Sequence, residues 1–186
     1  MSVADYAADL QREVERLNLQ GICVAGHSLG GAIALRMAAT YPSLVRSLAL
    51  IGTGARLRVA PRLLELAESD LQGADRTLES LAWAPGHEGL AGSYQPEKGP
   101  ATAPGMLYRD LAACDAFDMM ADLERIEQPA IVITGELDQM TPPKYARFLA
   151  EHLPHATLAL IPGAGHYVPY EQPDAVAEAL STWLAR

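Results

Sequence analysis

The stretch GICVAGHSLGGA, residues 21–32, decides the fold of this 186-residue chain. Four apolar residues, 22–25, precede a Gly-His-Ser-Leu-Gly turn, and residues 29–39 are rich in Ala, Leu and Met, which favour helix. The pattern therefore predicts a strand, a sharp turn and a helix, with Ser28 at the centre of a Gly-x-Ser-x-Gly motif. Glycine is expected on both sides of the serine because a side chain there would collide with neighbouring backbone.

A turn of this kind suits a nucleophile. The hydroxyl of Ser28 would project above the sheet edge, with the free N–H groups and the positive dipole end of the next helix beneath it. An ordinary structural turn is the alternative, because glycine and serine are both common residues. The apolar run before the turn and the helical pattern after it favour the nucleophile.

Continuous apolar runs alternate with helical patterns along the chain. The expected strands are 22–25, 45–51, 130–134 and 157–161, and the expected helices are about 3–18, 29–40, 142–153 and 173–184. Strands that are apolar throughout and alternate with helices indicate a parallel sheet covered on both faces. The sequence therefore predicts an α/β fold, a parallel sheet flanked by helices.

The chain between the second and third expected strands has a different character. Residues 56–121 contain three helical patterns interrupted by a Gly/Pro-rich loop, residues 85–105, and no convincing strand. We expect a helical lid, or cap, inserted into a core made of residues 1–55 and 122–186.

Three reactive residues each follow an expected strand. Ser28, Asp138 and His166 come just past the carboxyl ends of three different strands. Ligands of parallel α/β sheets bind beyond this edge of the sheet. We therefore expect a hydroxyl, a carboxylate and an imidazole to meet at one rim.

Composition and charge restrict the partners. The chain has 14 basic and 23 acidic residues, a net charge of −9, and no basic block, so neither nucleic acid nor an anionic membrane is an expected partner. No apolar run reaches the ~18 residues of a transmembrane helix, and no signal peptide is evident. The two cysteines, Cys23 and Cys114, are not expected to pair, and Cys23 is expected in the core. We expect a cytoplasmic protein.

No cofactor or metal is expected. The five histidines lack the spacing of metal ligands, and there is no Cys pair. The glycines of residues 26–31 are not followed by the lysine of a phosphate-binding loop.

Three segments resemble the α/β-hydrolase superfamily, in particular its lid-bearing esterase and lactonase-like members. They are GHSLGG at 26–31, GELDQMTPP at 135–143 and GAGHYVPYEQP at 163–173. Their order, serine then aspartate then histidine, is the chain order of that family.

The resemblance implies a serine hydrolase that cleaves a carboxylic ester or lactone through an acyl-enzyme. It implies Ser28 as nucleophile, His166 as base, Asp138 as the acid that orients the base, and the backbone N–H of Leu29 as one oxyanion donor. A small ester-like molecule is the expected substrate. C–C bond hydrolysis or other acyl transfer on the same triad, and a catalytically impaired interaction module, remain alternatives.

Three side chains are candidate substrate contacts. Trp83 and Met106 belong to the apolar residues of the expected lid, and His27 adjoins the nucleophile. For each of them, packing within the fold is the alternative.

Members of the family carry about four further strands, and a His-Gly-type loop that donates the second oxyanion N–H, before the first helix expected here. Residues 1–20 contain neither, so the fold is expected to be a truncated α/β-hydrolase fold with one unpaired edge at Ile22–Ala25. The chain is a fragment, a compact form whose edge a second subunit covers, or a form whose lid folds over the edge. We expect a truncated or minimal form that pairs with a second copy through Ile22–Ala25.

Overall fold

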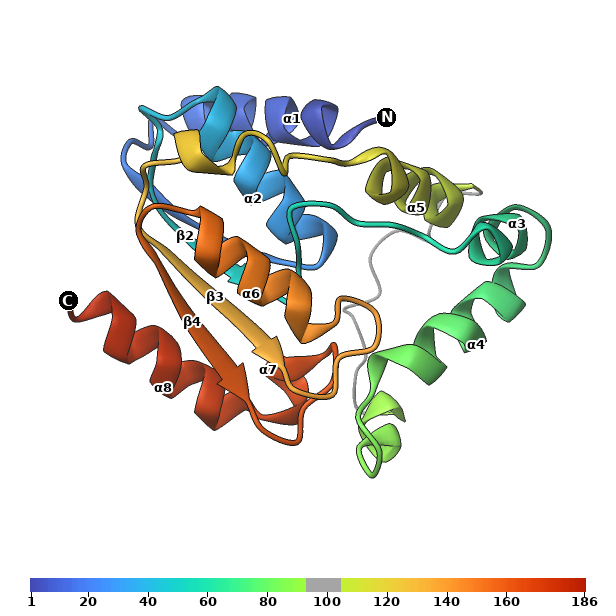
Figure 1. The fold of residues 1–186 in the computed structure, drawn as a ribbon. Coiled ribbons are helices and arrows are strands. Elements are labelled where there is room, and N and C mark those ends of the chain that lie inside the picture. The colour runs from blue at the N-terminus through green and yellow to red at the C-terminus, as the bar shows by residue number, and fades with distance from the viewer. Residues whose placement is uncertain (93–104) are drawn as a thin grey trace.

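The structure, a computed structural model, describes residues 1–92 and 105–186. Its centre is one sheet of four parallel strands in the order β1-β2-β3-β4 (Figure 1). The strands are β1 (Ile22–His27), β2 (Val45–Ile51), β3 (Ala130–Gly135) and β4 (Ala156–Ile161). The flanking helices are α1 (Val3–Arg16), α2 (Leu29–Thr40), α6 (Pro143–His152), α7 (Val168–Glu171) and α8 (Pro173–Leu184). The predicted α/β class and parallel sheet are confirmed.

Alternate residues of the central strands point to opposite faces of the sheet. Leu50 and Val132 pack in one core with α1, α2 and α6, whereas Ile131 and Ile133 pack in a second core with α7 and α8. Figure 1 shows α2 and α6 on one side of the sheet and α8 on the other. Both faces of β3 are covered, and all its residues are buried, which explains its continuous apolar run.

Strand β1 lies at an edge of the sheet, and only one of its faces is covered. Val24 and Gly26 are buried, but Cys23 and Ala25 are exposed. The prediction that Cys23 lies in the core is therefore wrong. On the face of the sheet that Cys23 occupies, α8 packs mainly against β3 and β4.

The described part of the segment between β2 and β3 is helical, as expected. It contains α3 (Pro61–Ser69), α4 (Leu71–Ala82), the 3₁₀ turn η1 (Glu88–Gly92), α5 (Met106–Ala116) and the 3₁₀ turn η2 (Leu123–Arg125). The break between α3 and α4 is at Asp70, whose carboxylate accepts the Gly73 N–H at 3.0 Å and so caps α4. Most of the Gly/Pro-rich loop predicted at 85–105 lies outside the described residues.

The two ends of this helical segment meet. Arg56, just after β2, forms an isolated antiparallel bridge with Asp118, and the Met119 N–H donates to the carbonyl of Ala55 at 2.8 Å. Within the segment, Leu63, Ala67 and Ala74 form a small core of their own. No helix in the described ranges has both the length and the apolar character needed to cross a membrane.

Candidate active site

Ser28 lies in a strained turn between β1 and α2. Its backbone has φ 53° and ψ −118°, a conformation that costs a non-glycine residue about 1–3 kcal/mol. The Ser28 N–H donates to the carbonyl of Ile51 at 2.9 Å, and the Ser28 carbonyl accepts the hydroxyl of Thr53 at 2.8 Å and the N–H of Gly31 at 2.9 Å. Bonds from β2, the loop after it and α2 therefore hold the serine in this geometry.

The space available for a side chain differs among the glycines around Ser28. A Cβ at Gly26 would lie 2.1 Å from the carbonyl oxygen of Gly30, whereas a Cβ at Gly30 would meet nothing within 4 Å. The expectation of a collision is therefore confirmed at Gly26 and wrong at Gly30. The close approach is at Gly31 instead, where a Cβ would lie 2.5 Å from Cγ2 of Thr53.

Asp138 and His166 form a buried pair beyond the ends of β3 and β4. Nδ1 of His166 lies 2.9 Å from Oδ2 of Asp138, and the two residues are 2% and 3% exposed. A carboxylate only accepts, so Nδ1 carries the proton and Nε2 keeps the lone pair of the neutral imidazole. The pair can therefore present a base at Nε2.

Thr141 completes the surroundings of the carboxylate. Its hydroxyl donates to Oδ2 of Asp138 at 2.8 Å and lies 3.2 Å from Nδ1 of His166. The backbone N–H groups of Met140 and Thr141 donate to the other oxygen, Oδ1, at 2.9 and 2.8 Å. Both oxygens of Asp138 are thus fixed, and with them the plane of the imidazole.

His27 supports His166 from the other side. Its Nε2–H donates to the backbone carbonyl of His166 at 2.8 Å, and the two ring centroids are 4.7 Å apart. Burial, and after it the charge of a protonated His166, lowers the pKa of His27 from 6.5 to about 4. At neutral pH His27 is therefore uncharged and positions the backbone of residue 166.

A buried glutamate joins the loop of His166 to the helical segment. Oε2 of Glu171 accepts the N–H groups of Gly165 and Ala84, each at 2.9 Å, and lies 2.9 Å from Nδ1 of His87. The N–H of His166 donates to the carbonyl of Ala82 at 2.7 Å. Two connections therefore join the end of α4 to the loop that carries His166. One is the backbone bond between His166 and Ala82, and the other runs through the carboxylate of Glu171.

Ser28 lines a cavity of about 220 Å³. Apolar side chains of the helical segment form one wall, and Thr141, Gln139 and Tyr145 contribute from the side of β3 and α6. The wall consists of Leu57, Val59, Leu63, Leu78, Leu81 and Leu111. An apolar group next to Ser28 would therefore be well accommodated.

The three predicted substrate contacts are not among the residues that line this cavity. His27 lies against His166, as described above. Trp83 is buried and packs on Tyr167, with ring centroids 4.8 Å apart, and Met106 is half-buried at the start of α5. Their contact with substrate stays a prediction. Thr141 and Tyr145, by contrast, line the cavity and were not expected there.

Ser28 and His166 are the expected nucleophile and base. In the described part of the chain, no hydrogen bond joins the hydroxyl of Ser28 to His166. Leu29 is the first residue of α2, so its N–H has no acceptor within the helix. Among residues 1–92 and 105–186, no group of three or more His, Cys, Asp and Glu side chains is placed to hold a metal ion.

Known proteins resemble this chain over most of its length. Residues 1–179 match the model of the alpha/beta hydrolase family. The pimeloyl-[acyl-carrier protein] methyl ester esterase of Neisseria meningitidis serogroup C is 31% identical over 157 residues, which are 77% of this chain and 61% of the relative. The putative carbamate hydrolase RutD of Pseudomonas syringae pv. syringae is 29% identical over 201 residues, 99% of this chain and 75% of the relative.

A solved structure also matches the whole chain. A thermophilic esterase of known structure superposes with a TM-score of 0.83 at 34% identity, covering 100% of this chain and 73% of the esterase. This chain spans about three fifths of the length of the Neisseria esterase. The matching family model, the parallel sheet and the strained serine turn together show that this chain belongs to the alpha/beta hydrolase family.

Proposed function

We propose that this chain is a serine hydrolase that cleaves a carboxylic ester or a lactone. The observation that carries the proposal is the buried pair of His166 and Asp138, 2.9 Å apart, at the same rim of the sheet as the strained Ser28. The names of the relatives, an esterase and a carbamate hydrolase, support carbonyl hydrolysis as the reaction class.

The proposed reaction has two halves. Nε2 of His166 takes the hydroxyl proton of Ser28 as Oγ attacks the ester carbonyl carbon, and Asp138 stabilises the imidazolium. The tetrahedral oxyanion accepts the N–H of Leu29 and collapses, and His166 returns the proton to the departing alcohol. Water then attacks the acyl-enzyme with His166 again as base, which releases the acid and restores Ser28. The missing bond between Ser28 and His166 would form as the substrate binds, since such bonds are often long in free enzymes.

We further propose that residues 56–121 form a lid over this site, on a core of residues 1–55 and 122–186. The leucine wall supports the proposal, since α3, α4 and α5 all contribute to the cavity of Ser28. Pairing of the edge strand Ile22–Ala25 with a second copy stays a prediction, which size-exclusion chromatography with light scattering would test.

Turnover of p-nitrophenyl acetate and butyrate tests the function. We expect Ser28→Ala to lower kcat by about 10³-fold or more. Ser181→Ala, an exposed serine of α8, is the matched control and should keep the wild-type rate. Equal rates for wild type and Ser28→Ala would refute the proposed mechanism.

A fluorophosphonate probe separates an enzyme from an impaired interaction module. If Ser28 is an active nucleophile, the probe should label the wild type, fail to label Ser28→Ala and label His166→Ala only slowly. A folded wild-type protein that takes up no label would favour the impaired module.

A further inference from the structure

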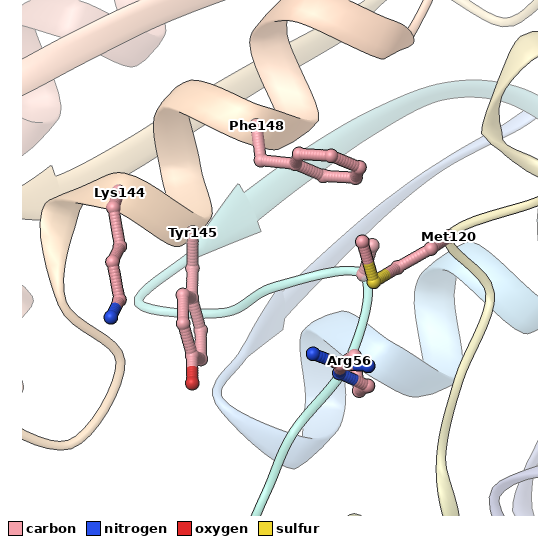
Figure 2. Close-up of a pocket in the computed structure, with 6 residues that line it drawn as sticks. Arg56, Met120, Lys144, Tyr145 and Phe148 are labelled. Carbon is pink, nitrogen blue, oxygen red and sulfur yellow. The ribbon is translucent and has the colours of Figure 1, made fainter.

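A second cavity adjoins the cavity of Ser28. It has a volume of about 300 Å³ and is lined by Ala55, Arg56, Met120, Lys144, Tyr145 and Phe148. Figure 2 shows Lys144, Tyr145 and Phe148 extending from α6, with Arg56 and Met120 coming from the two chain segments opposite. We call this space the cationic cavity, after Arg56 and Lys144.

Tyr145 connects the two cavities, because its side chain lines both of them. The ring packs closely on the backbone of the loop after β2, where a Cβ at Gly54 would lie 2.9 Å from Cδ2 of Tyr145. Glycine at position 54 therefore leaves room for the ring between the two cavities. The two cavities therefore share Tyr145 as a wall, and a substrate that occupied both would have to pass along its ring.

The two cations of this cavity are not neutralised by close ion pairs. The chain as a whole carries a net charge of −9, so a pair of cations at one cavity is not a general property of its surface. Nζ of Lys144 lies 5.8 Å from the ring centroid of Tyr145, and Lys144 forms no ion pair with any carboxylate of the described residues. The guanidinium of Arg56 has Asp118 as its partner, at the long distance of 3.8 Å, where both side chains are about half exposed.

The remaining lining of the cationic cavity is apolar. Ala55, Met120 and Phe148 present methyl, thioether and ring surfaces, and the Tyr145 ring adds a fourth apolar face. Such a lining accommodates a short hydrocarbon chain, while Arg56 and Lys144 supply donors for a carboxylate or a comparable anion.

We infer that the substrate carries an anionic group, which binds in the cationic cavity between Arg56 and Lys144 while the ester lies at Ser28. This inference rests on the proposed hydrolase function and adds the substrate class: an ester with a carboxylate or similar anion some distance from the reacting carbonyl. Tyr145 separates the charged end of such a substrate from the reacting end.

Paired substrates test the inference. p-Nitrophenyl hemiesters of succinate, glutarate and adipate carry the charge on the acyl side, and neutral p-nitrophenyl esters of equal chain length are their controls. 3-Acetoxybenzoate against phenyl acetate places the charge on the alcohol side. We expect kcat/KM to favour at least one charged member by about three- to tenfold, and the preference to fall as salt is raised from about 0.02 to about 0.5 M.

The variants Arg56→Gln and Lys144→Gln should each reduce this preference severalfold, because each lowers kcat/KM for the charged ester more than for the neutral ester of equal chain length. Arg147→Gln is the matched control, since Arg147 is an exposed cation of the same helix that does not line the cavity. Equal kcat/KM for charged and neutral esters on every pair, or an equal effect of Arg147→Gln, would overturn the inference while the proposed function stands.

Binding separates failure of the inference from failure of the function. Titration calorimetry of glutarate and of monomethyl glutarate into Ser28→Ala needs no turnover. Binding that Lys144→Gln and Arg56→Gln weaken, and Arg147→Gln does not, would support the anion site even if no ester were hydrolysed. Heats no larger than those of dilution, in low salt and at millimolar concentration, would overturn it.

Discussion

His27, the buried histidine beside His166 and Asp138, predicts a specific dependence of stability on pH. Folding lowers the pKa of His27 from 6.5 to about 4, mainly through burial. Between these two values the unfolded chain binds a proton at His27 that the folded chain does not bind. The folded state therefore loses stability as the pH falls from about 6.5 to about 4.

The size of this loss follows from the two pKa values. At about 1.4 kcal/mol per pKa unit, the full depression corresponds to about 3–4 kcal/mol, of which about 2 kcal/mol is lost between pH 7 and pH 5. His27→Gln removes the titrating group, and its amide is able to keep the donor to the carbonyl of His166. We expect the free energy of unfolding of this variant to fall by about 2 kcal/mol less than that of the wild type over the same interval.

Urea unfolding followed by circular dichroism at pH 5, 6, 7 and 8 measures the effect. Carboxylates also titrate toward low pH, so the relevant quantity is the difference between the wild-type and variant curves. His155→Gln replaces an exposed histidine and is the control, which should follow the wild type. Parallel curves for the wild type and His27→Gln would show that burial does not hold His27 neutral.

Three further predictions concern the supports of the site. Thr141→Val removes the hydroxyl that donates to the buried Asp138, so we expect kcat to fall about tenfold while circular dichroism shows an intact fold. Thr141→Ser should recover most of the lost kcat. Equal rates for the wild type and both variants would show that Thr141 does not orient Asp138. Gly26→Ala should abolish soluble expression or activity, while Gly30→Ala should keep both, and the reverse order would contradict the close approach between Gly26 and the carbonyl of Gly30. Glu171→Gln removes the charge that accepts three donors; it should lower the free energy of unfolding by about 2 kcal/mol, and a thermal melt that matches the wild type would argue against this.

The residues whose position in the fold the sequence predicts are those with a local signature. Ser28 stands between a continuous apolar run and a helical pattern, and Asp138 and His166 follow two further runs of the same kind. Because all parallel strands end at one edge, the order of elements alone brings these three residues to one rim. The buried strand β3 is equally predictable from the sequence, since a strand covered on both faces has to be apolar throughout.

The residues that the sequence misplaces depend on what covers them in three dimensions. Cys23 belongs to an apolar run, but its exposure is decided by how far α8 extends across the sheet. Thr141 is separated from His166 by 25 positions, so their 3.2 Å approach has no local signal. Trp83 and Met106 do not line the cavity of Ser28, where leucines of the helical segment do, and their contact with substrate stays a prediction.

The bonds between the end of α4 and the histidine loop limit how relatives of this protein can be recombined. A chimera that exchanges only residues 56–121 for those of another hydrolase would replace Ala82 and Ala84, whose backbone atoms bond to His166 and Glu171. The acceptor for the N–H of His166 would then belong to one parent and the histidine to the other. A chimera that also transfers residues 163–171 takes both partners of these bonds from one parent. Residues 56–121 together with 163–171 are therefore the smallest unit to exchange when substrate preference is moved between family members.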